Sequence, residues 1–197
     1  DYESNPRVKA KGIYLTLNTA ISDQKIDNLI EMAKKTEINT FVIDVKNDSE
    51  TFLYESEAAK KYLDNPKFYT KDFKKIMKKL KENNIYTIAR IVTFKSPRYA
   101  ISNPEKAITY KGTNNVYKNR KGVYWASAFD RNLWDYNIEV ALEAADYGFN
   151  EIQFDYVRFP ALSSSKRNRL DLKNKEDESR TAAIQKFLQK AYEEISK

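Results

Sequence analysis

The stretch NEIQFDYVRFP, residues 150–160, has the β-branched and aromatic composition of a strand but carries two charged side chains near its end. These are Asp155 and Arg158. Two explanations are open: the charges form a structural ion pair, or they mark the functional end of a strand. The arrangement of the other strands bears on this choice.

Four segments have strand composition, and helical patterns lie between them. The strands are predicted over 12–16, 40–46, 85–94 and 151–159. Helices are predicted around 26–33, over 71–82, over 133–147, and from 184 to the chain end. This β-α-β-α-β-α-β-α order is typical of a parallel sheet with right-handed crossovers. Residues 1–11 are polar and are predicted to be a lead-in or linker.

The connections between these elements are unequal in length. The turns from helix into strand are short, whereas the segments that leave the strands are long: 47–69, 95–130 and 160–177. Elaboration is therefore concentrated at the C-terminal ends of the strands. In parallel α/β folds this end carries the active site.

Alternation along each strand separates an apolar face from a polar one. The residues predicted to share the polar face are Tyr14, Thr16, Asp44, Lys46, Arg90, Gln153 and Asp155. In an open sheet covered by helices on both sides, both faces are buried and mostly apolar, so this many polar groups on one face would be unusual. A closed barrel opens its upper layers into a pocket. The pattern favours a barrel.

Composition limits the chemistry. The 197 residues include no Cys and no His, which excludes thiol nucleophiles, zinc fingers and a Ser-His-Asp triad within this chain. Carboxylates, Lys, Tyr or Arg must carry any acid–base catalysis. No cofactor or metal site is predicted, although Asp44, Asp48 and Asp155 could gather a hard cation. No apolar run approaches membrane-spanning length, and no signal-peptide pattern is found near residue 1.

The formal net charge of +7 favours contact with anionic polymers. Much of this charge has an ordinary explanation, because the Lys-rich helix 71–82 reads as amphipathic with a solvated face. The basic stretch SSSKRNR, residues 163–169, is interpreted as a solvated loop in preference to an anion site. A nucleotide- or nucleic-acid-binding α/β domain is the weakest interpretation, since the chain contains neither GxGxxG nor GxxxxGK[ST].

Four stretches together resemble a bacterial family of glycosyl hydrolase domains, which are (β/α)8 TIM-type barrels related to α-amylase-like glycosidases. They are KGIYLTLNTA, FVIDVKNDSE, IARIVTFKSPRYA and LWDYNIEVALEAADYGFNEIQFDYVRFP. The resemblance covers nearly all of residues 11–160 and implies that 12–197 is the N-terminal half of such a barrel, with about four β/α units. It also implies that the missing half is supplied by the rest of the native chain or by a partner.

Two positions depart from the family pattern. The family tends to have an acidic residue where this chain has Ser96, and a Gly soon after a Lys-Asp-Asp turn where this chain has Glu50. Both changes put polar substrate contacts in doubt. Neither departure affects the match to the family at Asp155.

In amylase-like barrels the fourth strand carries the nucleophile, and in another large group of glycosidase barrels it carries the acid. The resemblance therefore implies that Asp155 is a catalytic carboxylate in one of these two roles. The competing interpretation is an ion pair with Arg90 or Arg158. Arg90 is expected to keep Asp155 ionised. Asp44 and Lys46 either contact sugar hydroxyls, or orient Asp155, or form a buried pair that neutralises itself. The substrate-binding residues predicted are Tyr14, Asp44, Lys46, Arg90, Trp125, Gln153 and Arg158.

The sequence thus predicts a glycoside hydrolase that acts on a bacterial surface or extracellular polysaccharide. From this substrate we expect a secreted or cell-surface location, and no nucleic-acid partner. A non-catalytic carbohydrate-binding barrel is the alternative, in which the pocket is kept but the pair of acids is not.

Overall fold

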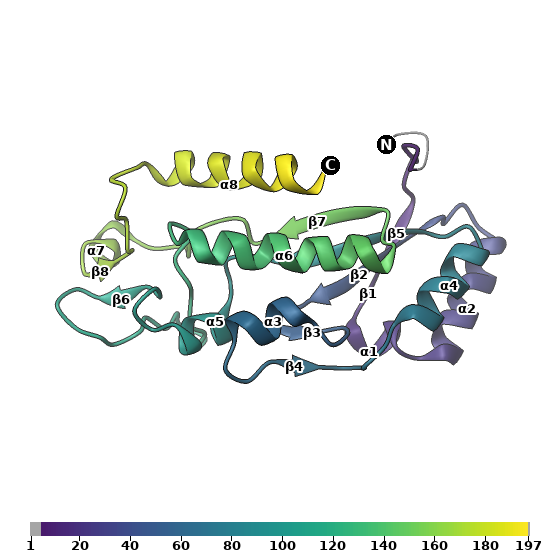
Figure 1. Ribbon diagram of the computed structural model, residues 1–197, viewed down its shortest axis with the longest axis horizontal. Coiled ribbons are helices and arrows are strands. Elements are labelled where there is room, and N and C mark those ends of the chain that lie inside the picture. The colour runs from purple at the N-terminus through teal and green to yellow at the C-terminus, as the bar shows by residue number, and fades with distance from the viewer. Residues whose placement is uncertain (1–4, 197) are drawn as a thin grey trace.

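The computed structural model describes residues 5–196 and contains a parallel sheet whose main strands follow one another in chain order (Figure 1). These strands are β1 (Gly12–Leu15), β2 (Thr40–Lys46), β5 (Tyr86–Val92) and β7 (Glu151–Asp155). The four predicted strands are confirmed, but β7 ends at Asp155 and not at residue 159. Two short strands extend the sheet beside β2: β3 (Thr51–Phe52) and β4 (Lys67–Phe68).

Helices cover one face of the sheet. The longer ones are α2 (Asp23–Lys34), α4 (Lys74–Glu82), α6 (Arg131–Tyr147) and α8 (Arg180–Ile195), and the short α1 (Leu17–Ala20) follows β1. Helix α6 packs on β5 and β7, and α8 packs along α6 (Figure 1). The apolar face of the sheet is buried beneath these helices, where Phe41, Ile43 and Ile91 have no exposed surface. The four predicted helices are therefore confirmed.

The helix boundaries follow from local sequence. The hydroxyl of Ser22 accepts the Lys25 N–H at the start of α2, and the Asp130 carboxylate accepts the Asn132 N–H at the start of α6. Helix α6 ends at Gly148, whose φ of 95° is left-handed and suits a residue without Cβ. None of the helices in residues 5–196 is long and apolar enough to cross a membrane.

The opposite face of the sheet is open. A hollow on this face is lined by side chains from all four main strands, including Tyr14, Val42, Ile88, Arg90 and Gln153. Within residues 5–196 the sheet does not close on itself, so a complete barrel is not observed. The architecture is a mixed α/β fold with one face covered by helices and one face free.

The long segments beyond the strand ends contain small elements of their own. These are α3 (Glu57–Tyr62), α5 (Pro97–Ser102), β6 (Thr109–Tyr110), α7 (Ser164–Arg167) and β8 (Leu170–Asp171). Strands β6 and β8 pair antiparallel, so the segments after β5 and after β7 are joined. Figure 1 shows this subassembly at one end of the molecule, beyond the strand tips. It has a separate apolar cluster of Ile108, Tyr117, Trp125 and Leu170.

Candidate active site

Four of the predicted site residues meet on the open face, at the C-terminal ends of neighbouring strands. Arg90 on β5 lies between Asp44 on β2 and Asp155 on β7. Its Nη1 donates to Asp44 Oδ1 at 2.6 Å, while Nε and Nη2 donate to Asp155 Oδ2 at 3.0 and 2.7 Å. The Tyr14 hydroxyl on β1 donates to Asp44 Oδ2 at 2.5 Å. The ion pair between Asp155 and Arg90, which the sequence left as an alternative to catalysis, is present.

Burial is graded across this network. The side chain of Asp44 is 5% exposed, that of Arg90 is 17% exposed, and that of Asp155 is 45% exposed. Asp155 is therefore the carboxylate that a molecule on the open face would meet first. Asp44 lies beneath and orients Arg90.

The network also shifts the proton affinities of its members. Burial alone would lower the pKa of Arg90, but the hydrogen bonds that it donates to Asp44 and Asp155 outweigh burial and raise the pKa above its ordinary value. Burial and the hydrogen bond to Asp44 raise the pKa of Tyr14 to about 12. At neutral pH the Tyr14 hydroxyl is thus a proton donor and the guanidinium is charged.

The backbone turns sharply directly after Asp155. Tyr156 has a φ of 54°, a left-handed conformation that is uncommon for an aromatic residue. Its N–H donates to Asp155 Oδ1 at 2.6 Å, so the turn holds the carboxylate oxygen that Arg90 does not bind. Because the strand ends here, alternation cannot place Arg158, and the prediction of a strand through residue 159 is wrong.

Lys46 is not on the open face, and this sequence prediction is wrong. The ladder between β2 and β5 pairs Asp44 with Arg90 but Lys46 with Ile91, so a β-bulge inserts one residue and reverses the alternation. Lys46 therefore shares the helix-covered side with Ile91 and has no exposed surface. In this position it does not line the hollow that contains Asp155.

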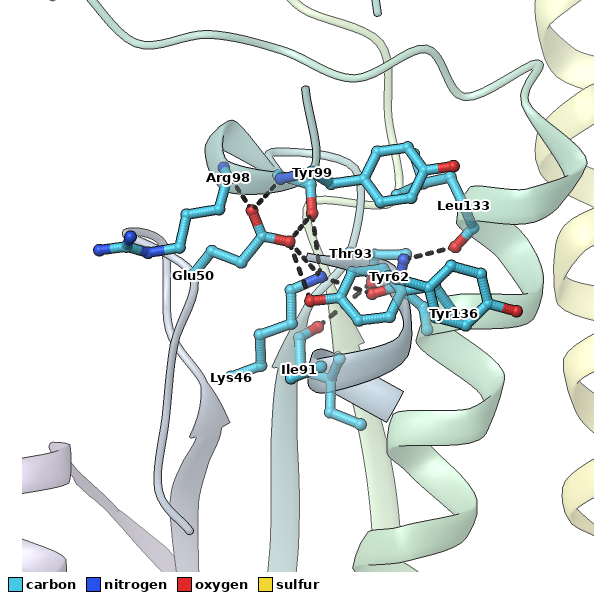
Figure 2. Close-up of polar contacts among 12 residues, drawn as sticks. Lys46, Glu50, Tyr62, Ile91, Thr93, Arg98, Tyr99, Leu133 and Tyr136 are labelled. Atoms are coloured by element: carbon cyan, nitrogen blue, oxygen red, sulfur yellow. Dashed lines mark hydrogen bonds and ion pairs between the residues drawn. The ribbon is translucent and has the colours of Figure 1, made fainter. Parts of the chain in front are cut away.

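Lys46 instead lies in a buried polar cluster, shown in Figure 2, which sequence reasoning missed. Its Nζ donates to Asn137 Oδ1 at 2.8 Å and to Ser96 Oγ at 3.1 Å, and lies 3.6 Å from Glu50 Oε1. The Tyr136 hydroxyl donates to the same Glu50 oxygen at 3.0 Å. Alternation along β2 had placed Lys46 on the same face as Asp44, so the sequence did not predict this cluster. The only sequence signal for it was the departure from the family pattern at Ser96 and Glu50.

Glu50 connects this cluster to α5. Its Oε2 accepts the backbone N–H groups of Arg98 and Tyr99 at 2.6 and 2.9 Å, and its Oε1 accepts the Ser96 hydroxyl. Burial lowers the pKa of Lys46 to about 8, against the opposing effect of Glu50. The cluster joins the segments that follow β2 and β5 to each other and to α6.

The remaining predicted residues lie around the network. Gln153 is exposed on the open face, in the hollow that also contains Arg90 and Asp155. Arg158 is exposed, and its guanidinium lies 5.1 Å from the ring centres of both Trp125 and Tyr156. Trp125 is only 3% exposed, so it is not the open stacking platform that the sequence suggested.

The three carboxylates considered for a hard cation do not gather. Asp44 and Asp155 both bind Arg90, whereas Asp48 pairs with Lys95 at 2.7 Å. In residues 5–196 no group of three or more acidic side chains is arranged to hold a metal ion.

Polar side chains at the C-terminal ends of parallel strands, on a sheet backed by helices, lie where the active sites of barrel-type α/β folds are found. The chain belongs to the family described as "Putative glycosyl hydrolase domain", whose model matches residues 12–197. The chain is 31% identical to a hypothetical protein from Ruminiclostridium thermocellum of known structure, with a TM-score of 0.79, over 92% of this chain and 91% of that one. Among curated proteins no match was found.

More distant structures share the fold. The chitobiase of Flavobacterium johnsoniae is 16% identical with a TM-score of 0.62, over 97% of this chain and 30% of that one. The α-galactosidase of Thermus thermophilus is 12% identical with a TM-score of 0.57, over 96% of this chain and 37% of that one. The chain thus spans about a third of these glycosidases but nearly all of the Ruminiclostridium protein.

Proposed function

We propose that the chain is the N-terminal half of a (β/α)8 glycoside hydrolase barrel and that Asp155 is one of its two catalytic carboxylates. The observation that carries the proposal is the position of Asp155 at the C-terminal end of β7, hydrogen-bonded to Arg90 and partly exposed on the open face. A carboxylate in this position contacts ligands that bind at the C-terminal ends of the strands, where active sites of this fold lie.

The surroundings of Asp155 suit a nucleophile or general base. The guanidinium of Arg90 donates two hydrogen bonds to one oxygen of the carboxylate, and the Tyr156 N–H fixes its second oxygen. Tyr14 and Gln153, which are exposed beside it, have hydroxyl and amide groups that can bond sugar hydroxyls. A second carboxyl group, about 5–10 Å from the first, is required for hydrolysis. Asp44 is too deeply engaged by Arg90 and Tyr14 for this role.

The second acid and the rest of the barrel would come from the remainder of the native chain or from a partner. The open polar face is consistent with this, because it would become the inside of the barrel. The proposed substrate is a bacterial surface or extracellular polysaccharide, and the proposed location is outside the cytoplasm. Immunodetection of the protein in culture medium and cell-wall fractions tests the location.

Hydrolysis is tested by release of reducing sugar from cell-wall and capsular glycans of the source organism. The proteins to compare are this chain, a longer form that completes the barrel, and the longer form with Asp155→Asn. We expect cleavage by the longer form and a loss of at least about 10³-fold in the variant, or about 4 kcal/mol of barrier. Asp48→Asn is the matched control, since Asp48 is also at the strand ends but pairs with Lys95, and it should retain activity.

A non-catalytic glycan-binding domain is the second candidate. It is favoured by the hydrogen bonds that already occupy both oxygens of Asp155. If the longer form binds glycan but never cleaves it, with or without Asp155, the enzymatic proposal fails and this candidate replaces it.

A further inference from the structure

A basic pocket lies directly beside the candidate active site. It has a volume of about 350 Å³ and lies between the segments that follow β5 and β7. The side chains that matter here are four cations and two aromatic rings: Arg120, Lys121, Arg158, Lys166, Tyr117 and Trp125. Among residues 5–196, no carboxylate lines this pocket.

The charge of the pocket is not neutralised locally. In residues 5–196, none of its four cations forms an ion pair with an acidic side chain. An adjoining hollow shares Arg120 and Lys166 and adds Lys118 and Arg169. These two also lack an acidic partner in the described part of the chain. Like charges held together without counter-charges raise the local concentration of anions.

A second observation points to a ligand that accepts hydrogen bonds. The indole N–H of Trp125 is buried and has no acceptor among the described residues. An indole nitrogen is a donor only, and a buried donor without a partner is unfavourable. Trp125 is one of the residues that line the pocket, so an oxyanion bound there is a candidate acceptor for this group.

The pocket is continuous with the site through Arg158. This residue lines the basic pocket together with Trp125, and it also lines a second hollow beside the site, which includes Arg90 and Asp155 but not Tyr14 or Gln153. Its guanidinium can donate to two oxygens of one carboxylate or phosphate. A polymer with its reacting unit at Asp155 would therefore place a neighbouring unit in the pocket.

We infer that this pocket is a subsite for an anionic unit of a glycan, one that bears carboxylate or phosphate groups. As a statement about the substrate, the inference rests on the proposed function. As a statement about binding, it can be tested without turnover. The cations bind the charged group, while Tyr117 and Trp125, which are largely buried, form part of the pocket wall.

The first test measures binding by isothermal titration calorimetry. The probes are polygalacturonate for carboxylate, poly(glycerol phosphate) for phosphate, neutral dextran, and a single-stranded DNA oligonucleotide. We expect one of the two anionic glycan-type polymers to bind at least tenfold more tightly than dextran, with an affinity that falls as salt is added. Arg120→Gln with Lys166→Gln should weaken this binding at least tenfold.

The matched control removes two charges elsewhere. Lys75 and Lys78 on α4 have side chains that are 78% exposed, and the double change Lys75→Gln with Lys78→Gln alters the net charge equally. Binding should change less than twofold in this control. Equal losses in both double variants, or equal affinity for dextran and the anionic polymers, would overturn the inference. Tightest binding of the oligonucleotide would overturn it too.

A second readout locates the ligand. The chain has two Trp residues, and Trp134 is a core residue whose indole donates to Ala128 O at 2.8 Å. The anionic polymer should change the intrinsic fluorescence through Trp125, and Trp125→Phe should abolish that change. A fluorescence change that persists in Trp125→Phe would place the ligand elsewhere. Failure to detect hydrolysis would overturn only the proposed function, because neither readout depends on turnover.

Discussion

Arg90 and Asp155 are joined by two hydrogen bonds although they are not register partners. In the ladder between β5 and β7, Arg90 is paired with Gln153, and Asp155 with Val92. The guanidinium therefore reaches along the strand direction to Asp155 Oδ2, while its Nη1 still bonds Asp44. One side chain thus ties the C-terminal ends of three neighbouring strands, and it does so at the point where ligands of this fold bind.

The first prediction concerns the stability contributed by Arg90. Arg90→Met should lower the free energy of unfolding by about 3 kcal/mol, because it leaves the nearly buried Asp44 carboxylate without its cation. Arg90→Lys should lower it by about 1–2 kcal/mol, since an ammonium group retains the charge but not the planar fork. Urea unfolding at pH 7 measures both.

A surface ion pair provides the control for this comparison. Lys75→Met breaks the exposed pair with Asp23 and should change stability by no more than about 0.5 kcal/mol. If Arg90→Met were as mild as Lys75→Met, the network would have no structural role.

The second prediction concerns stability between pH 8 and about 9.5. Burial lowers the pKa of Lys46 to about 8 in the folded protein, from its ordinary value of 10.5. In this window the unfolded chain holds a proton that the folded chain has released, so stability rises with pH, by up to about 1.4 kcal/mol per pH unit. Above pH 10 the trend reverses, because burial raises the pKa of Tyr54 and of Tyr136 well above 10.

The variant for this test replaces the buried pair as a whole. Lys46→Met with Glu50→Gln removes the titrating amine without leaving an unpaired buried charge, a replacement that is often tolerated. Urea unfolding at pH 7.5, 8.5 and 9.5 should show a rise for the wild type and a flatter profile for the variant. Equal slopes in the two proteins would rule out Lys46 as the source.

The third prediction concerns the phenol of Tyr14. Burial and the hydrogen bond to Asp44 together raise its pKa to about 12, so Asp44→Asn should lower this pKa by removing the carboxylate. The pKa should stay above 10, since burial remains. NMR titration of ring-labelled tyrosine measures it, with Tyr14→Phe to assign the signal. Asp64→Asn, on the exposed surface, is the control and should leave the titration unchanged.

The main elements of the fold were predictable because each produces a regular pattern over many residues. Helix α6 repeats apolar residues over 17 positions, and the seven residues of β2 are mostly β-branched or aromatic. Elements such as β6 and β8 are only two residues long, so no periodicity can reveal them. Their pairing depends on contacts between segments about 60 residues apart in the chain, which local patterns do not encode.

The candidate site was predictable where the strands are regular and not where they are interrupted. Tyr14, Asp44, Arg90 and Asp155 were correctly assigned to one face by alternation. The bulge after Asp44 places Lys46 on the opposite side of the sheet. The sequence has no turn residue such as Gly at this point, so it gives no local signal of the bulge. The left-handed Tyr156 ended β7 in the same unannounced way. Such irregularities are frequent beside functional sites.

The departures at Glu50 and Ser96 are explained together by the buried cluster. The family that the sequence resembles tends to have a Gly near the position of Glu50 and an acidic residue at that of Ser96. Here Glu50 has a φ of 56°, the left-handed conformation that favours Gly, and its carboxylate accepts the Ser96 hydroxyl. The resemblance thus implies that the segment after β5 supplies this carboxylate in other members of the family, whereas here Glu50 supplies it, 3.6 Å from Lys46 Nζ.

This exchange gives the fourth prediction, which is a double-mutant cycle. Glu50→Gly alone should lower stability by about 3 kcal/mol, because Lys46 loses its counter-charge in a fully buried place. Ser96→Asp alone should also destabilise, since it sets a second carboxylate against Glu50. Combined, the two changes should recover most of the loss, with a coupling of about 2 kcal/mol or more in urea unfolding.

The recovery has a specific structural reason. Ser96 is the N-cap of α5, and Glu50 now accepts the N–H groups of Arg98 and Tyr99 that an N-cap side chain would take. Asp is a favoured N-cap residue, so Ser96→Asp can take over these amides and face Lys46 at the same time. Ser96→Asn with Glu50→Gly is the matched control: it caps the helix without supplying charge and should recover less. Additive losses in the Asp pair would show that the two departures are unrelated.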